Sequence, residues 1–362
     1  MEALLSSPGN VNIRTIVSRG PCKESLHEAV AIAAPLDGPA QMFGSVDFGT
    51  YLRSVAKPFQ ALAMLRGGIG EAFSIAPREL AVICSSHAGE QIHRDLVRAL
   101  LERGGLTVGH LGCGIHSPFS RSEQNKIVAS GGVFDATCNN CSGKHTGMLL
   151  ACVAQGFPIE GYLEPDHPLQ RSIRAILELF TGEILDSSRL GVDGCGAPTY
   201  HVPVLAMAHA FRNLGDRDFL TRSGLLDRVD QIHDAIDSHP KAFSGEGRLP
   251  LRWSSYLRGK MRAKEGAEGV MAIWGAKGSL AIKTLDGNDR GLVHAIPPLL
   301  HGLNWINDAT LEQWLQEQPP QVRNVAGRVV GDIVVEVPDS CRLNGTYRPS
   351  VNPGNGVVRY NF

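Results

Sequence analysis

The sequence predicts a mixed α/β protein, with strands at both ends of the chain and a helix-rich region between them. Short apolar runs typical of strands lie near the two termini, whereas apolar residues at helical spacing dominate the middle. Strands need partners to bury their apolar faces, so we expect the two terminal segments to pair in a single sheet. The 362 residues suffice for one large domain or two of ordinary size.

The expected strands fall in two groups at opposite ends of the chain. Near the N-terminus they are residues 13–18 (IRTIVS) and 29–34 (AVAIAA). Near the C-terminus they are residues 272–274, 280–285 and 332–337 (DIVVEV). Their short length and apolar or alternating composition are typical of strands in a partly buried sheet.

The helix-rich middle carries three rows of apolar residues that recur every three or four positions, as on one face of a helix. These rows are Ile92, Leu96, Val97, Leu100 and Leu101; Leu169, Ile173, Ile176, Leu177 and Phe180; and Leu225, Val229, Ile232 and Ile236. Pro168 and Gly215 stand where a helix start and a helix stop are expected. We therefore assign the α/β part to roughly residues 1–60 and 265–362 and the helix-rich part to roughly 61–264, within one functional unit.

Composition disfavours several classes of protein. The formal net charge is −1, which argues against a nucleic-acid partner, because phosphate neutralisation needs an excess of Lys and Arg. No stretch approaches the roughly 18 apolar residues of a membrane helix. The N-terminal sequence MEALLSSPGN lacks the basic start and apolar length of a signal peptide. We therefore expect a cytoplasmic protein with no membrane partner, whose eight cysteines are reduced.

A first candidate site is Ser54-Val55-Ala56-Lys57, which precedes Pro58 and an apolar helical run. Residues i and i+3 share a helix face, with Cβ atoms about 5–6 Å apart, so a serine nucleophile here has an amine within reach. Burial depresses a lysine pKa and lets the amine act as a base. The S-x-x-K pattern also arises by chance with the serine as a simple helix cap, and taken alone it favours that interpretation.

A second candidate is the segment around Ser86 and His87, which follows the apolar run at residues 80–83. We expect a strand-to-helix loop here, a position that often carries ligand-binding groups. Ser86 is a candidate nucleophile or substrate-binding residue, and His87 is a candidate base. The alternative, a helix-capping serine beside a surface histidine, is the more frequent outcome for such a motif.

Cysteine and lysine motifs supply the remaining candidates. Cys138 and Cys141 form a C-x-x-C motif, which fits either a zinc or redox site or a pair of core cysteines, since no second C-x-x-C completes a four-thiolate site. Cys195 has a glycine on each side and follows Asp193, which implies a tight turn that exposes a thiol or a carboxylate. Lys264 leads into an apolar strand and is either a second amine at a strand edge or part of a polar turn.

Six sequence blocks, taken together, carry more information than any single motif. In chain order they are RSVAKPFQA, SSHAGE, CNNCSGKHTGM, DGCGAPTY, SHPKAFSGEGR and KEGAEG. In this order and spacing the set resembles the asparaginase II family, the rhizobial-type L-asparaginases. The similarity extends from about residue 12 to the last expected strands.

The resemblance implies a fold similar to that of serine β-lactamases and penicillin-binding proteins, which share the S-x-x-K arrangement. Such a fold has an α/β domain with an antiparallel sheet, a helical domain, and an active site between them. The resemblance also implies a homodimer whose small-molecule substrate is L-asparagine.

The resemblance assigns roles to individual residues. Ser54 and Lys57 match the first catalytic Ser-Lys pair of the family, and Ser86 matches the serine of the second pair, with Lys264 as its lysine. The residues that match the family's zinc ligands, with one zinc ion per chain, are Cys141, Lys144 and Cys195. The residues expected to contact the substrate are Asp193, which lies next to the metal, His87 and Glu268.

Amide hydrolysis needs a nucleophile, a base and a group that stabilises the oxyanion. We expect one Ser-Lys pair to supply the nucleophile and the other to move protons, so that an acyl-enzyme forms, ammonia leaves and water releases aspartate. Which serine attacks stays open at this point. Two other functions are considered: a penicillin-recognising serine hydrolase, which the lack of a signal peptide disfavours, and a non-catalytic zinc or thiol sensor, which leaves both Ser-Lys pairs without a role.

Overall fold

The computed structural model contains two compact units. It describes residues 12–45, 48–257, 259–337, 348–351 and 358–361. The sheet unit takes its described residues from Met1–Thr50, Pro203–Arg212 and Gly266–Phe362, and the helical unit comprises Tyr51–Val202 and Asn213–Glu265. Among the described helices, none combines the length and the apolar character needed to cross a membrane.

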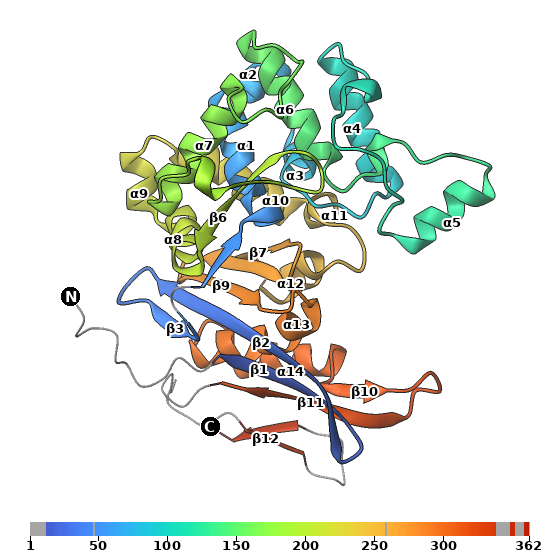
Figure 1. Ribbon diagram of the computed structural model, residues 1–362, viewed down its shortest axis with the longest axis vertical. Coiled ribbons are helices and arrows are strands. Elements are labelled where there is room, and N and C mark those ends of the chain that lie inside the picture. The colour runs from blue at the N-terminus through green and yellow to red at the C-terminus, as the bar shows by residue number, and fades with distance from the viewer. Residues whose placement is uncertain (1–11, 46–47, 258, 338–347, 352–357, 362) are drawn as a thin grey trace. The chain divides into compact units, whose positions relative to one another are not determined.

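The sheet unit is built on an antiparallel sheet with the strand order β10-β11-β1-β2-β9-β8, and β3 pairs with β2 (Figure 1). Its strands are β1 (Ile13–Arg19), β2 (Cys22–Pro35), β3 (Gln41–Phe43), β8 (Val270–Gly275), β9 (Gly278–Thr284), β10 (Gln321–Arg323) and β11 (Val329–Glu336). A separate ribbon pairs β12 (Arg348–Val351) with β13 (Val358–Asn361). Ile16 of β1 lies opposite Val334 of β11, so the prediction that the two ends of the chain share one sheet is confirmed.

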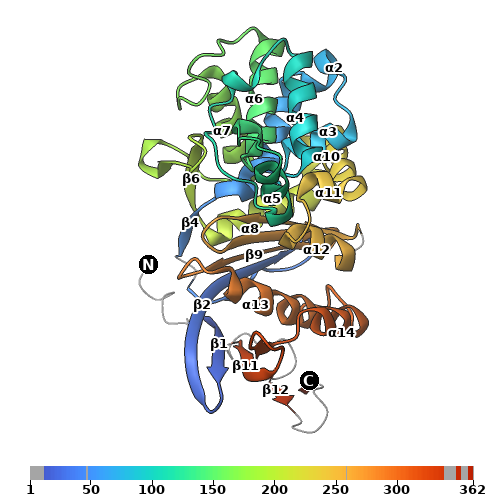
Figure 2. The ribbon, with the colours of Figure 1, turned by 90° about the vertical axis from the view of Figure 1, so that its right-hand side faces the viewer.

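Helices cover both faces of this sheet (Figure 2). They are α8 (Val204–Gly215), α13 (Asp289–Gly302) and α14 (Asp308–Glu317). Ser279 of β9 donates a hydrogen bond of 2.6 Å to the Ala208 carbonyl in α8. Thr284 lies five residues further along β9 and therefore points to the other face, where it contacts Gly291 of α13. All residues of β8 and β9 are buried, as expected for strands covered on both sides.

The helical unit packs its helices around α1 (Figure 1), which contacts α6, α7 and α10. Its helices of eight or more residues are α1 (Lys57–Arg66), α4 (Gln91–Arg103), α5 (Arg121–Ala129), α6 (Ser142–Gln155), α7 (Pro168–Thr181), α10 (Leu226–Ser238) and α12 (Leu249–Leu257). Its shorter helices are η1 (Arg53–Ala56), α2 (Ile69–Phe73), α3 (Pro77–Ile83), η2 (Val108–His110), η3 (Ala136–Cys138), η4 (Ser187–Arg189), α9 (Arg217–Arg222) and α11 (Pro240–Phe243). Its strands are β5 (Leu190–Val192), β6 (Pro198–Pro203) and β7 (Met261–Gly266). Along the chain, the division between the two units falls within β4 (Gly49–Tyr51).

The helices predicted from apolar spacing are confirmed. The three rows fall on α4, α7 and α10, and each contributes buried residues to the core. Pro168 begins α7 and Gly215 ends α8, as the helix signals indicated. The seven cysteines that the structure describes are free thiols.

One expected element is wrong: residues 80–83 end the helix α3 and are not a strand. Pro77 begins this helix, and the Glu79 carboxylate accepts a hydrogen bond of 2.9 Å from the backbone N–H of Ala76, which caps the first turn. The helix packs against α6 and α10. All residues of this short run are apolar, so the run shows neither the alternation of a strand nor the spacing of a helix. The sequence alone therefore could not distinguish the two.

Candidate active site

The centre of the site is the hydroxyl of Ser86, which lies between two lysine amines. Nζ of Lys57 lies 2.8 Å from the Ser86 Oγ, and Nζ of Lys264 lies 2.9 Å from the same oxygen. Both lysines are 1% exposed and Ser86 is 3% exposed. A buried hydroxyl with two amines at hydrogen-bond distance is an arrangement that stores and moves protons.

Three different elements of the helical unit bring these groups together. Lys57 is the first residue of α1, Lys264 lies in β7, and Ser86 lies in the loop that follows α3. The loop is held in place by two hydrogen bonds: the hydroxyl of Ser85 donates to the Val82 carbonyl at 2.7 Å, and the backbone N–H of His87 donates to the Asn140 carbonyl at 3.2 Å. The Ser86 hydroxyl is therefore fixed on a short, rigid segment.

Burial controls the charge of the two amines. Burial lowers the pKa of Lys57, because a charged ammonium loses its hydration in the interior. Burial lowers the pKa of Lys264 well below its usual range, and the charge of Lys57 acts in the same direction. Lys264 also donates a hydrogen bond of 2.8 Å to the Glu265 carbonyl, which holds its amine in place. A neutral lysine beside a serine hydroxyl is a competent base.

Ser54 is placed differently from the expectation of a Ser54–Lys57 pair. It lies half-buried in the turn η1, and among the described residues no hydrogen bond of its hydroxyl is found, whereas the Lys57 amine is directed to Ser86. The preceding residue, Arg53, has φ +48°, a left-handed backbone conformation that costs about 1 kcal/mol or more outside glycine. The motif spacing placed Ser54 and Lys57 on one helix turn, but Lys57 reaches past that turn to the loop after α3.

Arg53 is a site residue that the motif analysis missed. Its Nε donates a hydrogen bond of 2.8 Å to Oδ1 of Asp193, and its backbone N–H donates to the hydroxyl of Thr199 at 3.1 Å. The strained backbone and this ion pair direct its side chain toward the turn that carries Cys195. In the sequence, Arg53 stood out only as the first residue of the block RSVAKPFQA. A left-handed backbone at an arginine cannot be predicted from the neighbouring residue types.

A second cluster contains the two cysteines and the lysine that resemble zinc ligands. Cys141 precedes α6 and Lys144 lies in its first turn, while Cys195 lies in the turn between β5 and β6. The Lys144 amine donates a hydrogen bond of 2.9 Å to Sγ of Cys195, and Sγ of Cys195 lies 3.9 Å from Oδ2 of Asp193. All three ligand candidates are at most 4% exposed. The structure therefore brings Lys144 and Cys195 together, although they are 51 positions apart in the sequence.

The charges of this cluster depend on one another. A hydrogen bond between the two sulfurs lowers the pKa of Cys141 well below the usual thiol range and raises that of Cys195, and the Lys57 and Lys144 charges also favour the Cys141 thiolate. Burial lowers the pKa of Lys144, but the Cys195 and Cys141 sulfurs outweigh burial and raise it. Asp193 keeps a lowered pKa in spite of its burial, because Lys144 and Arg53 stabilise its carboxylate. The cluster thus holds a thiolate and an ammonium group side by side.

His87 and Glu268, both expected to contact substrate, have other partners. His87 is fully buried, its Nδ1 accepts a hydrogen bond of 3.1 Å from the Gly89 N–H, and its Nε2 lies 2.9 Å from the Ser142 hydroxyl. Burial lowers the pKa of His87 well below its usual range, so the ring is neutral. Glu268 belongs to the sheet unit, where it occupies an exposed turn with φ +65° and its carbonyl accepts from Lys283.

Comparison with known proteins identifies one family. The family described as L-asparaginase II matches residues 15–335. No curated protein matches the chain. Among solved structures, "Crystal Structure Analysis of Mglu in its tris and glutamate form" has 12% identity and a TM-score of 0.35, and the match covers 77% of this chain and 59% of that one. "Crystal Structure Analysis of Mglu in its native form" has 13% identity and a TM-score of 0.34, with 76% and 64% covered. The chain therefore spans about three fifths of the length of these structures.

Proposed function

The chain belongs to the L-asparaginase II family, and from this premise we propose that it hydrolyses L-asparagine to L-aspartate and ammonia with Ser86 as the nucleophile. The observation that supports this proposal is the contact of one hydroxyl, Ser86 Oγ, with two buried amines, those of Lys57 and Lys264. Ser54 has no such contact among the described residues. The family itself supports an amidohydrolase-type function.

The reaction divides into two steps. In the first, a neutral lysine takes the Ser86 proton while Oγ attacks the side-chain amide carbonyl, and the tetrahedral adduct collapses when the nitrogen gains a proton and leaves as ammonia. In the second, water attacks the acyl-serine ester, a lysine takes the water proton, and Ser86 regains its proton as L-aspartate departs. Two amines on one hydroxyl supply a base and an acid for each step.

We propose that Asp193, with its carboxylate held by Arg53, binds the α-amino group of the substrate. The pair lies in the helical unit together with Ser86, and the Asp193 carboxylate stays ionised because its pKa is lowered. An ionised, partly buried carboxylate is a suitable partner for an ammonium group. Glu268 and His87 stay predictions as substrate contacts, although the neutral, doubly bonded ring of His87 fits a supporting role better.

We also propose one zinc ion per chain at Cys141, Lys144 and Cys195. No group of three or more His, Cys, Asp or Glu suited to a metal occurs within the described residues. The resemblance to the family supplies Lys144 as the third donor. Two sulfurs and a nitrogen converge in a buried cluster with a low-pKa thiol, which suits zinc. Lys144, whose pKa the two sulfurs raise, would release its proton on binding the ion. Zinc bound there would supply a Lewis acid that orients the substrate. The serine chemistry runs through the lysines.

Further proposals rest on the family resemblance: a fold of the β-lactamase type, a homodimer and a cytoplasmic location. Light scattering of the purified chain tests the dimer directly. A monomer at micromolar concentration contradicts it.

The experiment that tests the function is ammonia release from L-asparagine and from L-glutamine, measured side by side. We expect turnover of L-asparagine by the wild type and a loss of at least a thousandfold in kcat in Ser86→Ala. The resemblance to the family predicts a similar loss in Ser54→Ala, as a residue that moves protons. Ser279→Ala is the matched control: its hydroxyl is as buried as that of Ser86, but it donates to the Ala208 carbonyl in the sheet unit. Wild-type turnover in Ser86→Ala rules out this nucleophile, and wild-type turnover in both variants rules out the serine mechanism.

A further inference from the structure

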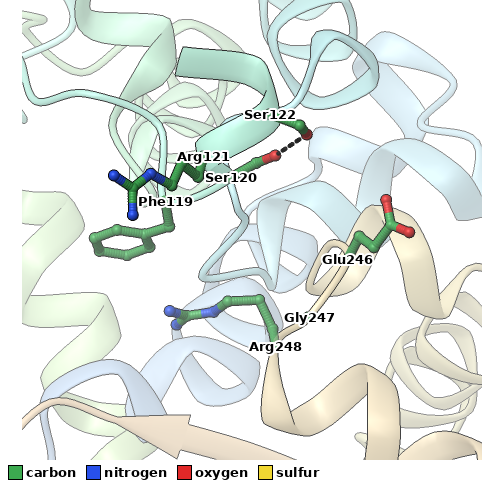
Figure 3. Close-up of a pocket in the computed structure, with 7 residues that line it drawn as sticks. All are labelled: Phe119, Ser120, Arg121, Ser122, Glu246, Gly247 and Arg248. Carbon is green, nitrogen blue, oxygen red and sulfur yellow. Dashed lines mark hydrogen bonds between the residues drawn. The ribbon is translucent and has the colours of Figure 1, made fainter. Parts of the chain in front are cut away.

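A pocket of about 540 Å³ lies between two loops of the helical unit (Figure 3). One loop runs from Phe119 to Ser122 at the start of α5, and the other runs from Glu246 to Arg248 at the start of α12. None of the residues proposed for the reaction lines it. The second loop belongs to the block SHPKAFSGEGR, which has no role in the proposed chemistry.

The residues that line the pocket carry more positive than negative charge, two arginines against one glutamate. Figure 3 shows the guanidinium groups of Arg121 and Arg248 on the same side as the Phe119 ring, while the Glu246 carboxylate points the other way. Arg121 is exposed and makes no ion pair with any residue that the structure describes. The hydroxyls of Ser120 and Ser122 are 3.0 Å apart and point away from the Arg121 guanidinium (Figure 3). The two guanidinium groups form a donor-rich surface on one side of the pocket.

Arg248 is held in place by two contacts, but not all of its hydrogen-bond donors have a partner. Its guanidinium carbon lies 4.8 Å from the centre of the Phe119 ring, a cation–π contact, and its Nη2 forms an ion pair with Oε1 of Glu265. Its Nε is buried and finds no hydrogen-bond partner among the described residues. A guanidinium has five N–H donors in a planar fork that matches a carboxylate. The side chain is partly exposed, so the guanidinium can also bind a carboxylate ligand from the pocket.

Both loops are fastened to the segment that carries Ser86. The backbone N–H of Glu246 donates a hydrogen bond of 2.6 Å to Oε1 of Glu90, and the backbone N–H of Ser120 donates to the Ala88 carbonyl at 3.0 Å. Gly245 has φ +103° and approaches Ala88 so closely that a Cβ atom would lie 2.5 Å from the Ala88 Cβ. The pocket is therefore preformed and attached to the catalytic loop.

A short chain of contacts joins the pocket to the base. Arg248 pairs with the side chain of Glu265, the carbonyl of Glu265 accepts from the Lys264 amine at 2.8 Å, and that amine lies 2.9 Å from Ser86. We propose that the pocket binds a small carboxylate ligand through Arg248 and Arg121, and that binding is sensed at Ser86 through Glu265 and Lys264. The binding itself is independent of the proposed reaction, whereas the effect on Ser86 rests on it.

Succinate is the probe, because it carries carboxylates but no amide to hydrolyse. Calorimetric titration of the full-length protein is expected to give a saturable isotherm that weakens at least tenfold in Arg121→Gln and in Arg248→Gln. Arg222→Gln, which removes an exposed arginine at the end of α9, is the matched control and is expected to bind as the wild type does. Arg121 is exposed and forms no ion pair with a described residue, so its variant stays informative even if Arg248→Gln is unstable. No saturable binding, or equal binding by wild type and Arg121→Gln, overturns the proposal.

Kinetics distinguish the source of the carboxylate. If the pocket receives the carboxylate of the substrate itself, succinate competes with L-asparagine, and Arg121→Gln raises KM for L-asparagine but not for its methyl ester. If it receives a separate ligand, succinate changes kcat without competing. Either result supports the pocket, while absence of any effect of bound succinate on turnover overturns the coupling to Ser86. A protein that binds succinate but releases no ammonia refutes the proposed function and leaves the pocket standing.

Discussion

Two amines that share one hydroxyl cannot both stay protonated in the interior. Two unit charges about 5 Å apart repel by several kcal/mol at the effective dielectric of a protein site, and burial adds a desolvation cost for each. Lys57 and Lys264 meet this condition at Ser86. At the residue scale, the site therefore contains a neutral lysine without needing a histidine as base, and the neutral ring of His87 is free to support the loop.

The pH dependence of the rate follows from this geometry. A lysine base works when it is deprotonated, and burial lowers the pKa of Lys264 well below its usual range, so the active form is populated below the pH at which an ordinary lysine loses its proton. We expect kcat/KM for L-asparagine to rise with pH through neutrality into the alkaline range. A pH–rate profile measures this, and a maximum below pH 6 contradicts a lysine base and points to a histidine.

At the scale of elements, the Ser86 loop depends on how closely α3 meets α6. A Cβ atom on Gly143, in the first turn of α6, would lie 2.1 Å from the Val82 carbonyl, which is the same carbonyl that accepts the Ser85 hydroxyl. Only glycine allows this approach. The end of α3, and with it Ser86, is therefore positioned by a residue that takes no part in the chemistry.

Gly143→Ala tests this contact. Alanine favours a helix over glycine by about 1 kcal/mol, yet we expect a net destabilisation of about 1–3 kcal/mol and a fall in kcat of tenfold or more, because the two helices must separate. Thermal unfolding and ammonia release are the measurements. Gly109→Ala is the control, since its Cβ meets only the Thr107 hydroxyl at an ordinary 3.5 Å. Equal stability of Gly143→Ala and the wild type contradicts the assigned contact.

The proposed zinc site also depends on the meeting of two elements. The start of α6 brings Cys141 and Lys144, and the turn between β5 and β6 brings Cys195. We expect about one zinc per chain in the wild type and loss of the metal in Cys141→Ala and Cys195→Ala, with weaker asparagine binding but an intact fold, because a core of this size does not depend on one ion.

Elemental analysis and Michaelis constants of the wild type and both variants are the measurements for the metal. Cys152→Ala is the matched control, since Cys152 is equally buried in α6 but lies at its far end. If the wild type carries no metal and added zinc changes nothing, the three residues are a packed cluster, and the serine chemistry stands without it.

At the scale of the whole molecule, the burial of the catalytic lysines lowers the stability of the folded protein. The folded-state pKa of Lys264 is lowered from 10.5, so between that value and its folded pKa the unfolded chain binds more protons than the folded one. Stability therefore falls as the pH falls through this window and is lowest below it. Removing the amine removes this pH-dependent loss.

Lys264→Met is the corresponding variant. We expect it to be inactive and about 1 kcal/mol more stable than the wild type at pH 7, with a smaller gain at pH 10, where the lysine is closer to neutral in the unfolded chain as well. Thermal unfolding of both proteins at the two pH values measures the difference. Lys260→Met, on an exposed residue close by in sequence, is the control. A gain that is equal at both pH values contradicts the assigned protonation.

The sequence by itself determined the elements and the family of this protein. Periodic apolar rows predicted α4, α7 and α10, and short apolar runs predicted β1, β2, β8, β9 and β11, because such spacing reflects local burial. Six ordered blocks identified the family, and that result agrees with the match over residues 15–335.

Only the tertiary structure decided which side chains meet. Motif spacing paired Ser54 with Lys57, whereas the folded chain directs Lys57 to a serine 29 positions away and brings Lys264 from 178 positions away to the same oxygen. The return of residues 203–212 to the sheet unit and the left-handed backbone of Arg53 also left no local signal. Contacts between distant segments are selected by the packing of the whole core, and periodicity in a short window reports only which face of an element is buried.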